Sequence, residues 1–360
     1  MKFFLFVFFA LSGIVHAAPA EFDLSNVFAR GMMLQREARN PVFGRADAGA
    51  AVSVSFNGQQ KETVADANGN WLIWLDPMPP ADQGLELVAQ AGARTVKVPG
   101  ILIGDVWIAA GDYGLAKEMS PAARKLTDGE REPDIRMYLC RMGVSPYPVS
   151  RHPMPSMYIR ADQDGMKKFS SILYAFARTI RKAEKVPVGF FNSSGRFSLT
   201  GAMPAQSAPY LKHPGNQDLA AAMRKTLPGE EDGKAAYTAY ARAMRAWIND
   251  ARERVRAGRH PDLAPEIPNA GLAFGGDFNA RIHPVRLFPV KGVIWYYHDR
   301  ESYPGGAPQT FDRYRALIQG WREVLGNPEL PFYFVQHHHP GGVEKNPGKQ
   351  SDLPLVQSEL

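Results

Sequence analysis

Three apolar runs of the sequence are each followed directly by polar side chains that can transfer protons or stabilise charge. Each run has the length and composition of a buried strand. The polar residues are Asp112 and Tyr113 after residues 104–110, Ser194 and Arg196 after residues 186–191, and Tyr297, His298 and Asp299 after residues 292–296. Carboxylates, hydroxyls, an imidazole and a guanidinium in one crevice would suit acid–base or acyl-transfer chemistry. These residues therefore form the candidate binding site.

Each of these residues also has a simpler interpretation. Asp112 could act as a general base on water while Arg196 holds an oxyanion, but an aspartate here more often caps the following helix. Ser194 has no base assigned to it, and an unactivated serine is a weak nucleophile. His298 and Asp299 could form a base and its orienter, although sequence neighbours rarely bond in this way and a polar loop is simpler. No catalytic residue is assigned from these side chains alone.

Three consecutive histidines, His337 to His339, follow a fourth apolar run. Adjacent residues on an extended segment point to opposite faces, so three in a row seldom converge on one metal ion. We therefore interpret them as an exposed or tail-packing cluster. We expect no metal and no other cofactor.

The segments that position the candidate residues alternate between strand and helix over residues 101–340. Buried parallel strands are expected at 104–110, 186–191, 292–296 and 332–336, and amphipathic helices at 169–180, 235–257 and 311–325. This alternation predicts an α/β domain with a parallel sheet and helices on both faces. Ligands of such sheets bind beyond the carboxyl ends of the strands, where the candidate residues lie.

Two further features of this part concern its surface. The stretches 201–232 and 258–275 are rich in proline, glycine and polar residues, so long loops are expected there. The helix expected at 235–257 carries several arginines, namely Arg242, Arg245, Arg252, Arg254 and Arg256. They suit either an anionic partner or the solvent-facing side of an amphipathic helix, and we prefer the second interpretation.

Residues 21–100 have a different pattern, with short strands separated by turn residues every ten or so positions. Residues 51–56 alternate between apolar and polar side chains, and Asn57-Gly58 follows them as a hairpin turn. A second turn cluster at 67–70 separates two further strands. The spacing predicts a small β-sandwich.

The ends and the composition of the chain indicate an exported globular protein. Residues 1–20 combine Lys2, a short apolar run and small residues at cleavage spacing, as in a signal peptide; an uncleaved membrane anchor is the alternative. We expect a secreted or periplasmic protein with no membrane segment after cleavage, and a polar tail at 341–360.

With 360 residues, 45% of them hydrophobic, the chain is long enough to bury a core without disulfides. The single Cys140 cannot form a disulfide within the chain. A net charge of +6 is too thinly spread to argue for nucleic acid.

Several segments, in order, resemble the sialate O-acetylesterase family over most of residues 22–336. The resemblance rests on Asn26-Val27-Phe28 through Leu34-Gln35-Arg36, Val42-Phe43-Gly44, Gly104-Asp105-Val106-Trp107, Phe169-Ser170-Ser171, Val186-Pro187-Val188-Gly189, Asn192-Ser193-Ser194, Gly292-Val293-Ile294-Trp295-Tyr296 and Leu330-Pro331-Phe332-Tyr333. It implies an SGNH-hydrolase-like (flavodoxin-like) α/β domain accompanied by a β-sandwich. Members of the family remove acetyl groups from sugars by serine catalysis without a metal.

The family's catalytic blocks are altered in this sequence. The family places its serine in a Gly-Gln-Ser-Asn turn, where this chain has Gly111-Asp112-Tyr113-Gly114. The family's Asn-Ser-Ser-Trp-Gly-Gly-Thr becomes Asn192 to Ser198 with bulky Arg196 and Phe197, and Asp299 replaces a glutamate in the third block. The family's Asp-x-x-His has no counterpart before Leu360. A phenol with a pKa near 10 is a poor substitute for the activated serine.

Three functions follow as hypotheses. The first is an esterase homologue without standard catalysis that binds acetylated or acidic carbohydrate in its crevice. The second is an active O-acetylesterase with a rearranged site built on Asp112, Arg196, His298 and Asp299. The third is an interaction protein in which Arg196 and Arg300 bind an acidic partner.

Overall fold

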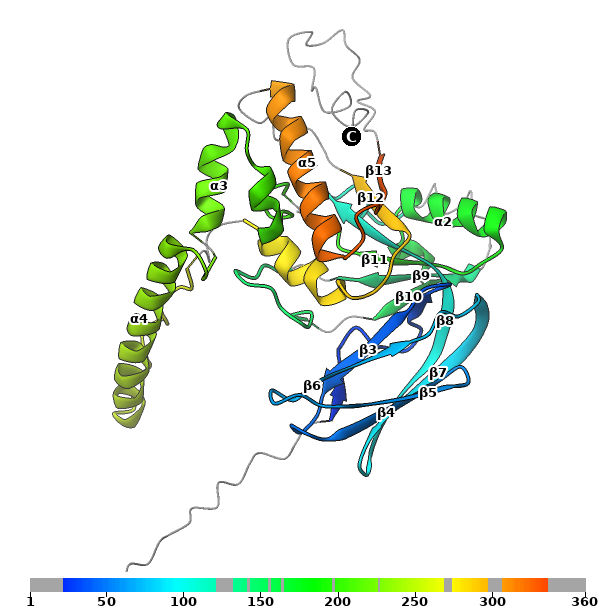
Figure 1. The fold of residues 1–360 in the computed structure, drawn as a ribbon, viewed down its shortest axis with the longest axis horizontal. Helices are drawn as coiled ribbons and strands as arrows, with labels where there is room; N and C mark the ends of the chain where they lie inside the picture. The colour runs from blue at the N-terminus through cyan, green and yellow to red at the C-terminus, as the bar shows by residue number, and fades with distance from the viewer. Residues whose placement is uncertain are drawn as a thin grey trace, which may run out of the picture.

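A computed structural model describes residues 22–120, 132–140, 143–154, 157–162, 165–195, 198–225, 227–268, 274–296 and 306–335. A β-sandwich formed by the N-terminal strands lies against one end of a parallel sheet that carries helices on its two faces (Figure 1). Within the described residues, no helix is long and apolar enough to cross a membrane.

The β-sandwich consists of two sheets that bury one face of each strand. One sheet holds β1 (Asp23–Leu24), β3 (Asn40–Arg45) and β6 (Asn70–Leu75), and the other holds β2 (Met33–Gln35), β4 (Ala51–Phe56), β5 (Gln59–Val64), β7 (Ala81–Ala91) and the first half of β8 (Arg94–Gly111). The expected alternation in β4 is confirmed, because Val52, Val54 and Phe56 are buried. Asn57 and Gly58 have φ angles of 47° and 76°, as a tight hairpin turn requires.

Strand β8 joins the two parts of the molecule. Its first half pairs antiparallel with β7, and its second half, from Asp105 onward, is the centre of the parallel sheet. The strand runs without a break past residues 100 and 101, where the sequence pattern places the domain boundary. The β-sandwich and the carboxyl end of the central strand of the sheet are therefore connected through one continuous backbone segment.

The expected parallel sheet is present and contains two strands that the sequence analysis missed. Its spatial order is β10 (Tyr158–Ala161), β9 (Glu132–Leu139), β11 (Val188–Asn192), β8, β12 (Gly292–Tyr296) and β13 (Phe332–Val335). All neighbours are parallel except β10 against β9. Strand β9 escaped notice because Asp134 and Arg136 interrupt its apolar residues.

The two faces of this sheet bury two separate cores. Val293 and Trp295 of β12 point into the core under α5 (Gly306–Val324), whereas Ile294 packs with α2 (Ser171–Glu184) on the opposite face. Ser170 caps α2 by accepting a hydrogen bond from the Leu173 amide. The expectation of helices on both faces is thus confirmed.

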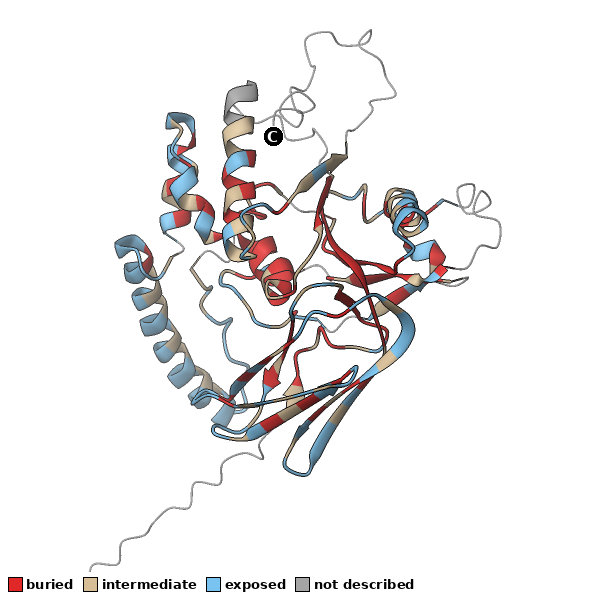
Figure 2. Ribbon diagram, turned by 45° about the vertical axis from the view of Figure 1, so that its right-hand side comes forward, coloured by how far each residue is buried: buried red, intermediate tan, exposed pale blue. Residues whose placement is uncertain are grey.

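The remaining helices correct two expectations. The stretch 201–232 is not a long loop, because it contains α3 (Gln217–Arg224) and the short helices η2 (Ala205–Tyr210) and η3 (Pro214–Asn216). The alanine-rich α3 was hidden by its proline and glycine neighbours. The long helix α4 (Glu231–Arg256) covers neither face of the sheet, and Gly233 is its one buried residue. Figure 2 shows most of α4 in exposed and intermediate colours, apart from the buried strands of the parallel sheet. The other short helical segments are η1 (Met166–Lys168), η4 (Phe278–Ile282) and η5 (His283–Val285).

Candidate functional site

The carboxyl ends of β8, β11 and β12 meet at one edge of the parallel sheet. The Asp112 amide donates a hydrogen bond to the Tyr296 carbonyl oxygen at 2.6 Å, and the Gly195 amide donates one to the Gly111 carbonyl oxygen at 2.9 Å. The structure therefore brings together the segments that carry Asp112, Tyr113 and Ser194. Four other candidates lie outside the described residues, namely Arg196, Tyr297, His298 and Asp299, and so do His337 to His339.

Two glycines allow the turn after β8 to lie against β12. Gly111 has a φ of +106°, and a Cβ atom there would lie 1.8 Å from the Tyr296 carbonyl oxygen. A Cβ atom on Gly114 would lie 2.1 Å from the Tyr296 ring. Larger residues at either position would push the turn away from β12, so the glycines fix where Asp112 and Tyr113 stand.

Asp112 and Tyr113 form a local turn. The Asp112 Oδ1 accepts a hydrogen bond from the Tyr113 amide at 2.7 Å. The Tyr113 carbonyl oxygen accepts hydrogen bonds from the amides of Ala116 and Lys117 at 3.0 and 2.7 Å. Residues 113–117 form this turn, and the Asp112 carboxylate is bonded to its first amide. Its hydrogen bond is structural in kind.

Tyr113 is the most accessible described residue of the candidate site. This residue is 48% exposed, and a Cβ atom on Gly195 would lie 3.7 Å from its ring carbon Cε1. The ring thus borders the turn after β11. An exposed phenol between two strand ends offers a flat surface and a hydroxyl group to a ligand.

Ser194 is held by its own turn. Its hydroxyl donates a hydrogen bond to the Asn192 Oδ1 at 2.5 Å, and its amide donates to the same atom at 3.0 Å. Asn192 is 5% exposed and is fixed at the end of β11. An amide oxygen does not accept the serine proton as a base would, so this contact does not activate Ser194 as a nucleophile.

The buried Arg281 holds the turn after β11 in place, and the sequence analysis did not predict this role. Its Nη1 donates hydrogen bonds to the carbonyl oxygens of Gly195 and Ser193 at 2.7 and 3.2 Å, and its Nη2 lies 2.7 Å from the Asp277 Oδ1. Arg281 is 2% exposed, and burial lowers its pKa. Burial also raises the pKa of Asp277 to about 6, even though the Arg281 charge acts in the opposite direction. The i, i+4 spacing of Asp277 and Arg281 is a weak indication of this ion pair in the sequence.

A second buried contact connects Arg281 to the β-sandwich through His152. The His152 Nε2 lies 3.0 Å from the Arg281 carbonyl oxygen, and its Nδ1 lies 3.2 Å from the Tyr138 hydroxyl. The His152 amide donates to the Asn26 Oδ1 at 3.1 Å, and the Asn26 amide nitrogen returns a bond to the His152 carbonyl. Burial lowers the pKa of His152 to about 4, so the ring is neutral at pH 7. Nothing in the sequence pattern indicates this role.

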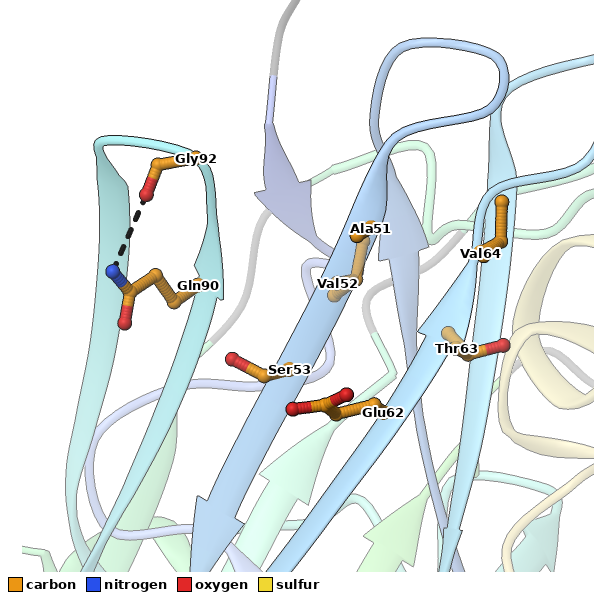
Figure 3. A pocket seen from close by; sticks show the side chains of 8 residues that line it. All are labelled: Ala51, Val52, Ser53, Glu62, Thr63, Val64, Gln90 and Gly92. Carbon is orange, nitrogen blue, oxygen red and sulfur yellow. Dashed lines mark hydrogen bonds between the residues drawn. The ribbon is translucent and has the colours of Figure 1, made fainter.

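Two surface hollows lie away from the strand ends. One of about 550 Å³ lies on the β-sandwich, where Glu62 is the one charged residue in its lining (Figure 3). It is bordered by Ala51, Val52, Ser53, Glu62, Thr63, Val64, Gln90 and Gly92. The other, of about 600 Å³, lies along α4. Across the described residues, no three histidine, cysteine, aspartate or glutamate side chains are grouped so that they could hold a metal ion.

Comparison with known proteins finds sialate O-acetylesterases among the curated relatives. No family model matches the sequence. The sialate O-acetylesterase of Rattus norvegicus is 24% identical over 380 residues, covering 92% of this chain and 63% of the rat protein. That of Homo sapiens is 23% identical over 355 residues, covering 89% of this chain and 58% of the human protein. The chain thus spans about 60% of the length of these relatives.

A solved structure supports the same relationship at the level of the fold. The crystal structure of a carbohydrate acetylesterase from Xanthomonas citri matches with a TM-score of 0.65 at 24% identity, covering 87% of this chain and 60% of that chain. The chain therefore has an SGNH-like α/β fold with a β-sandwich before it. Together, these likenesses confirm the resemblance to the sialate O-acetylesterase family that the sequence motifs indicate.

Proposed function

We propose that this protein is an exported carbohydrate-binding protein that uses the framework of a carbohydrate esterase without standard serine catalysis. Its ligand would be an acetylated or acidic sugar bound at the carboxyl ends of β8, β11 and β12. The observation that carries the proposal is the presence of exposed Tyr113 in the turn after β8, where the resemblance places a serine nucleophile. Export is proposed from the signal-like pattern of residues 1–20.

The hydrogen bonds of the site support binding over catalysis. Acyl transfer needs a hydroxyl next to a base, together with donors for the oxyanion. The Ser194 hydroxyl is bonded to an amide oxygen, and one oxygen of Asp112 is bonded to the Tyr113 amide. The second Asp112 oxygen and the Tyr113 ring are suited to a sugar hydroxyl and a sugar face.

Calorimetric titration of the full chain with O-acetylated sialic acid and O-acetylated plant oligosaccharides would test this function. We expect binding to at least one of these sugars, weakened by Tyr113→Ala, and no hydrolysis of 4-nitrophenyl acetate above buffer. Tyr210→Ala is the control, because Tyr210 is similarly exposed, at 41%, but lies in η2. Absence of binding to every acetylated sugar would contradict the proposal.

An active O-acetylesterase with a rearranged site is the second candidate. It is favoured by the contact between the Asp112 amide and Tyr296, because His298 and Asp299 follow Tyr296 by two and three residues in the chain. In this case Asp112 would activate water and Arg196 would stabilise the oxyanion. Acetyl release that is abolished by Asp112→Asn or Tyr113→Phe would establish this function and exclude the first.

A further inference from the structure

The exposed helix α4 has one side on which positive charge is not neutralised. Between Asp232 and Asp250 the helix contains no carboxylate, while Lys234, Arg242 and Arg245 lie in this segment. The three cations recur at intervals of eight and three residues, which places them along one side of the helix. They border the hollow of about 600 Å³ on α4.

The ion pairs of α4 distinguish these cations from Arg254. The Arg254 guanidinium lies 2.6 Å from carboxylate oxygens of both Asp250 and Asp262. In contrast, the Lys234 Nζ lies 4.0 Å from its one carboxylate contact, Glu231, and Arg242 and Arg245 form no ion pair with any described residue. Two exposed guanidinium groups a turn apart can both bind carboxylates of a ligand.

Tyr237 adds an aromatic ring to the lining of the hollow. Tyr237 lies between the cations along the helix and in the wall of the hollow, and burial, followed by the charge of Tyr147, raises the pKa of its hydroxyl. Tyr147 is 51% exposed and belongs to the loop that follows β9. The same loop is bonded to the site, because the Arg281 Nε donates to the Gly143 carbonyl oxygen at 3.3 Å. The wall of the hollow thus combines an aromatic ring with three cations.

We propose that the hollow on α4 binds the carboxylates of an acidic polysaccharide, separately from the site at the strand ends. Arg242 and Arg245 would bind successive carboxylates, and the Tyr237 ring would contact the face of a sugar. From Lys234 to Arg245 the helix rises about 16 Å, enough for several sugar units. A chain of negatively charged sugars fits the alternation of cation and aromatic ring better than an isolated small anion, which one arginine would bind.

The test compares the full chain with two double variants of equal charge. Arg242→Gln/Arg245→Gln removes the two arginines of the hollow and leaves Lys234, and Arg252→Gln/Arg256→Gln removes two exposed arginines on the same helix outside it. Glutamine preserves length and helix propensity. The probe is polygalacturonate in a calorimetric titration at low salt. We expect about tenfold weaker binding for the first variant, equivalent to about 1.4 kcal/mol. The second variant should bind nearly as the natural chain does.

Two further probes identify the kind of ligand. Fully methyl-esterified polygalacturonate keeps the sugar backbone without its charge, and vesicles of phosphatidylglycerol keep negative charge without the sugar. Weak binding of both supports the proposal. Four results would each overturn it. The esterified polymer could bind as tightly as polygalacturonate, or the vesicles could bind more tightly than polygalacturonate. Polygalacturonate could fail to bind, or the two double variants could lose equal affinity for it.

These outcomes are independent of the proposed function. The α4 variants should leave the binding of a small O-acetylated sugar at Tyr113 unchanged. Tyr113→Ala should in turn leave the effect of Arg242→Gln/Arg245→Gln on polygalacturonate in place.

Discussion

The second half of β8, which belongs to the parallel sheet, begins at Asp105 and is followed directly by Asp112. The carboxylates of these two aspartates have very different surroundings. Asp105 is 3% exposed where the β-sandwich meets the parallel sheet, and Arg36 binds it at 2.8 and 3.2 Å. The Lys291 Nζ lies 3.8 Å away. Asp112, at the other end, accepts one hydrogen bond from the next residue. The junction is thus fixed by several side chains, whereas the strand end retains polar groups for a ligand.

Replacing the buried arginine under the strand end should give the largest effect. Arg281→Met would leave Asp277 buried without its partner and the Gly195 and Ser193 carbonyl oxygens without a donor. We expect a loss of about 3–5 kcal/mol in the free energy of unfolding, measured by urea denaturation. A loss under 1 kcal/mol would contradict this, because Arg281 would then stabilise the strand ends no more than an ordinary surface residue does.

The junction should respond next. Asp105→Asn removes the charge that holds Arg36 and Lys291, and we expect a loss of about 2–3 kcal/mol in the same measurement. Lys61→Met is the control, because it breaks an exposed pair with Asp76 at 2.6 Å and should cost under about 0.5 kcal/mol. Similar losses in the two variants would remove the distinction between the junction and an ordinary surface pair.

The buried histidine predicts a pH dependence. The pKa of His152 falls from its ordinary 6.5 to about 4 on folding, so the unfolded chain binds this proton at higher pH. The stabilisation is therefore complete above pH 6.5 and is lost as the pH falls toward 4, by up to about 3 kcal/mol. The difference in unfolding free energy between the natural chain and His152→Gln should shrink over this range. A constant difference would show that His152 does not titrate in this way.

Asp112→Asn should have the smallest effect on stability. The asparagine oxygen can still accept the Tyr113 amide, so the turn is kept and the change should be under about 0.5 kcal/mol. Affinity for an acetylated sugar should fall, because a charged acceptor is lost. If Asp112→Asn unfolded more easily but bound the sugar normally, Asp112 would be a stabilising residue like Asp105 and not a ligand-binding one.

The sequence patterns predicted those parts of the molecule that depend on local composition. The apolar runs of β8, β11 and β12 identified the central strands and hence the edge where their polar successors meet. Strand β9 was missed because its inward-facing charges, such as Arg136, are satisfied by distant carbonyl groups, those of Gly31 and Gly100 among them.

The supporting residues of the site could not be predicted in the same way. Arg281 binds carbonyl groups more than eighty positions earlier in the chain, and His152 pairs with Asn26 from the β-sandwich. Such contacts arise from the tertiary fold and leave no periodic signal. The exposure of α4 was also unexpected, because an amphipathic pattern shows that a helix has an apolar side but not what covers it.

The central claim is that the esterase framework persists here without a working nucleophile. Incubation of the full chain with an activated acetyl ester, followed by intact-protein and peptide mass spectrometry, tests it most directly. We expect no acetyl group on Tyr113, on Ser194 or on any other side chain at the strand ends at any time point. An acetylated residue that forms and then decays with turnover would contradict the claim.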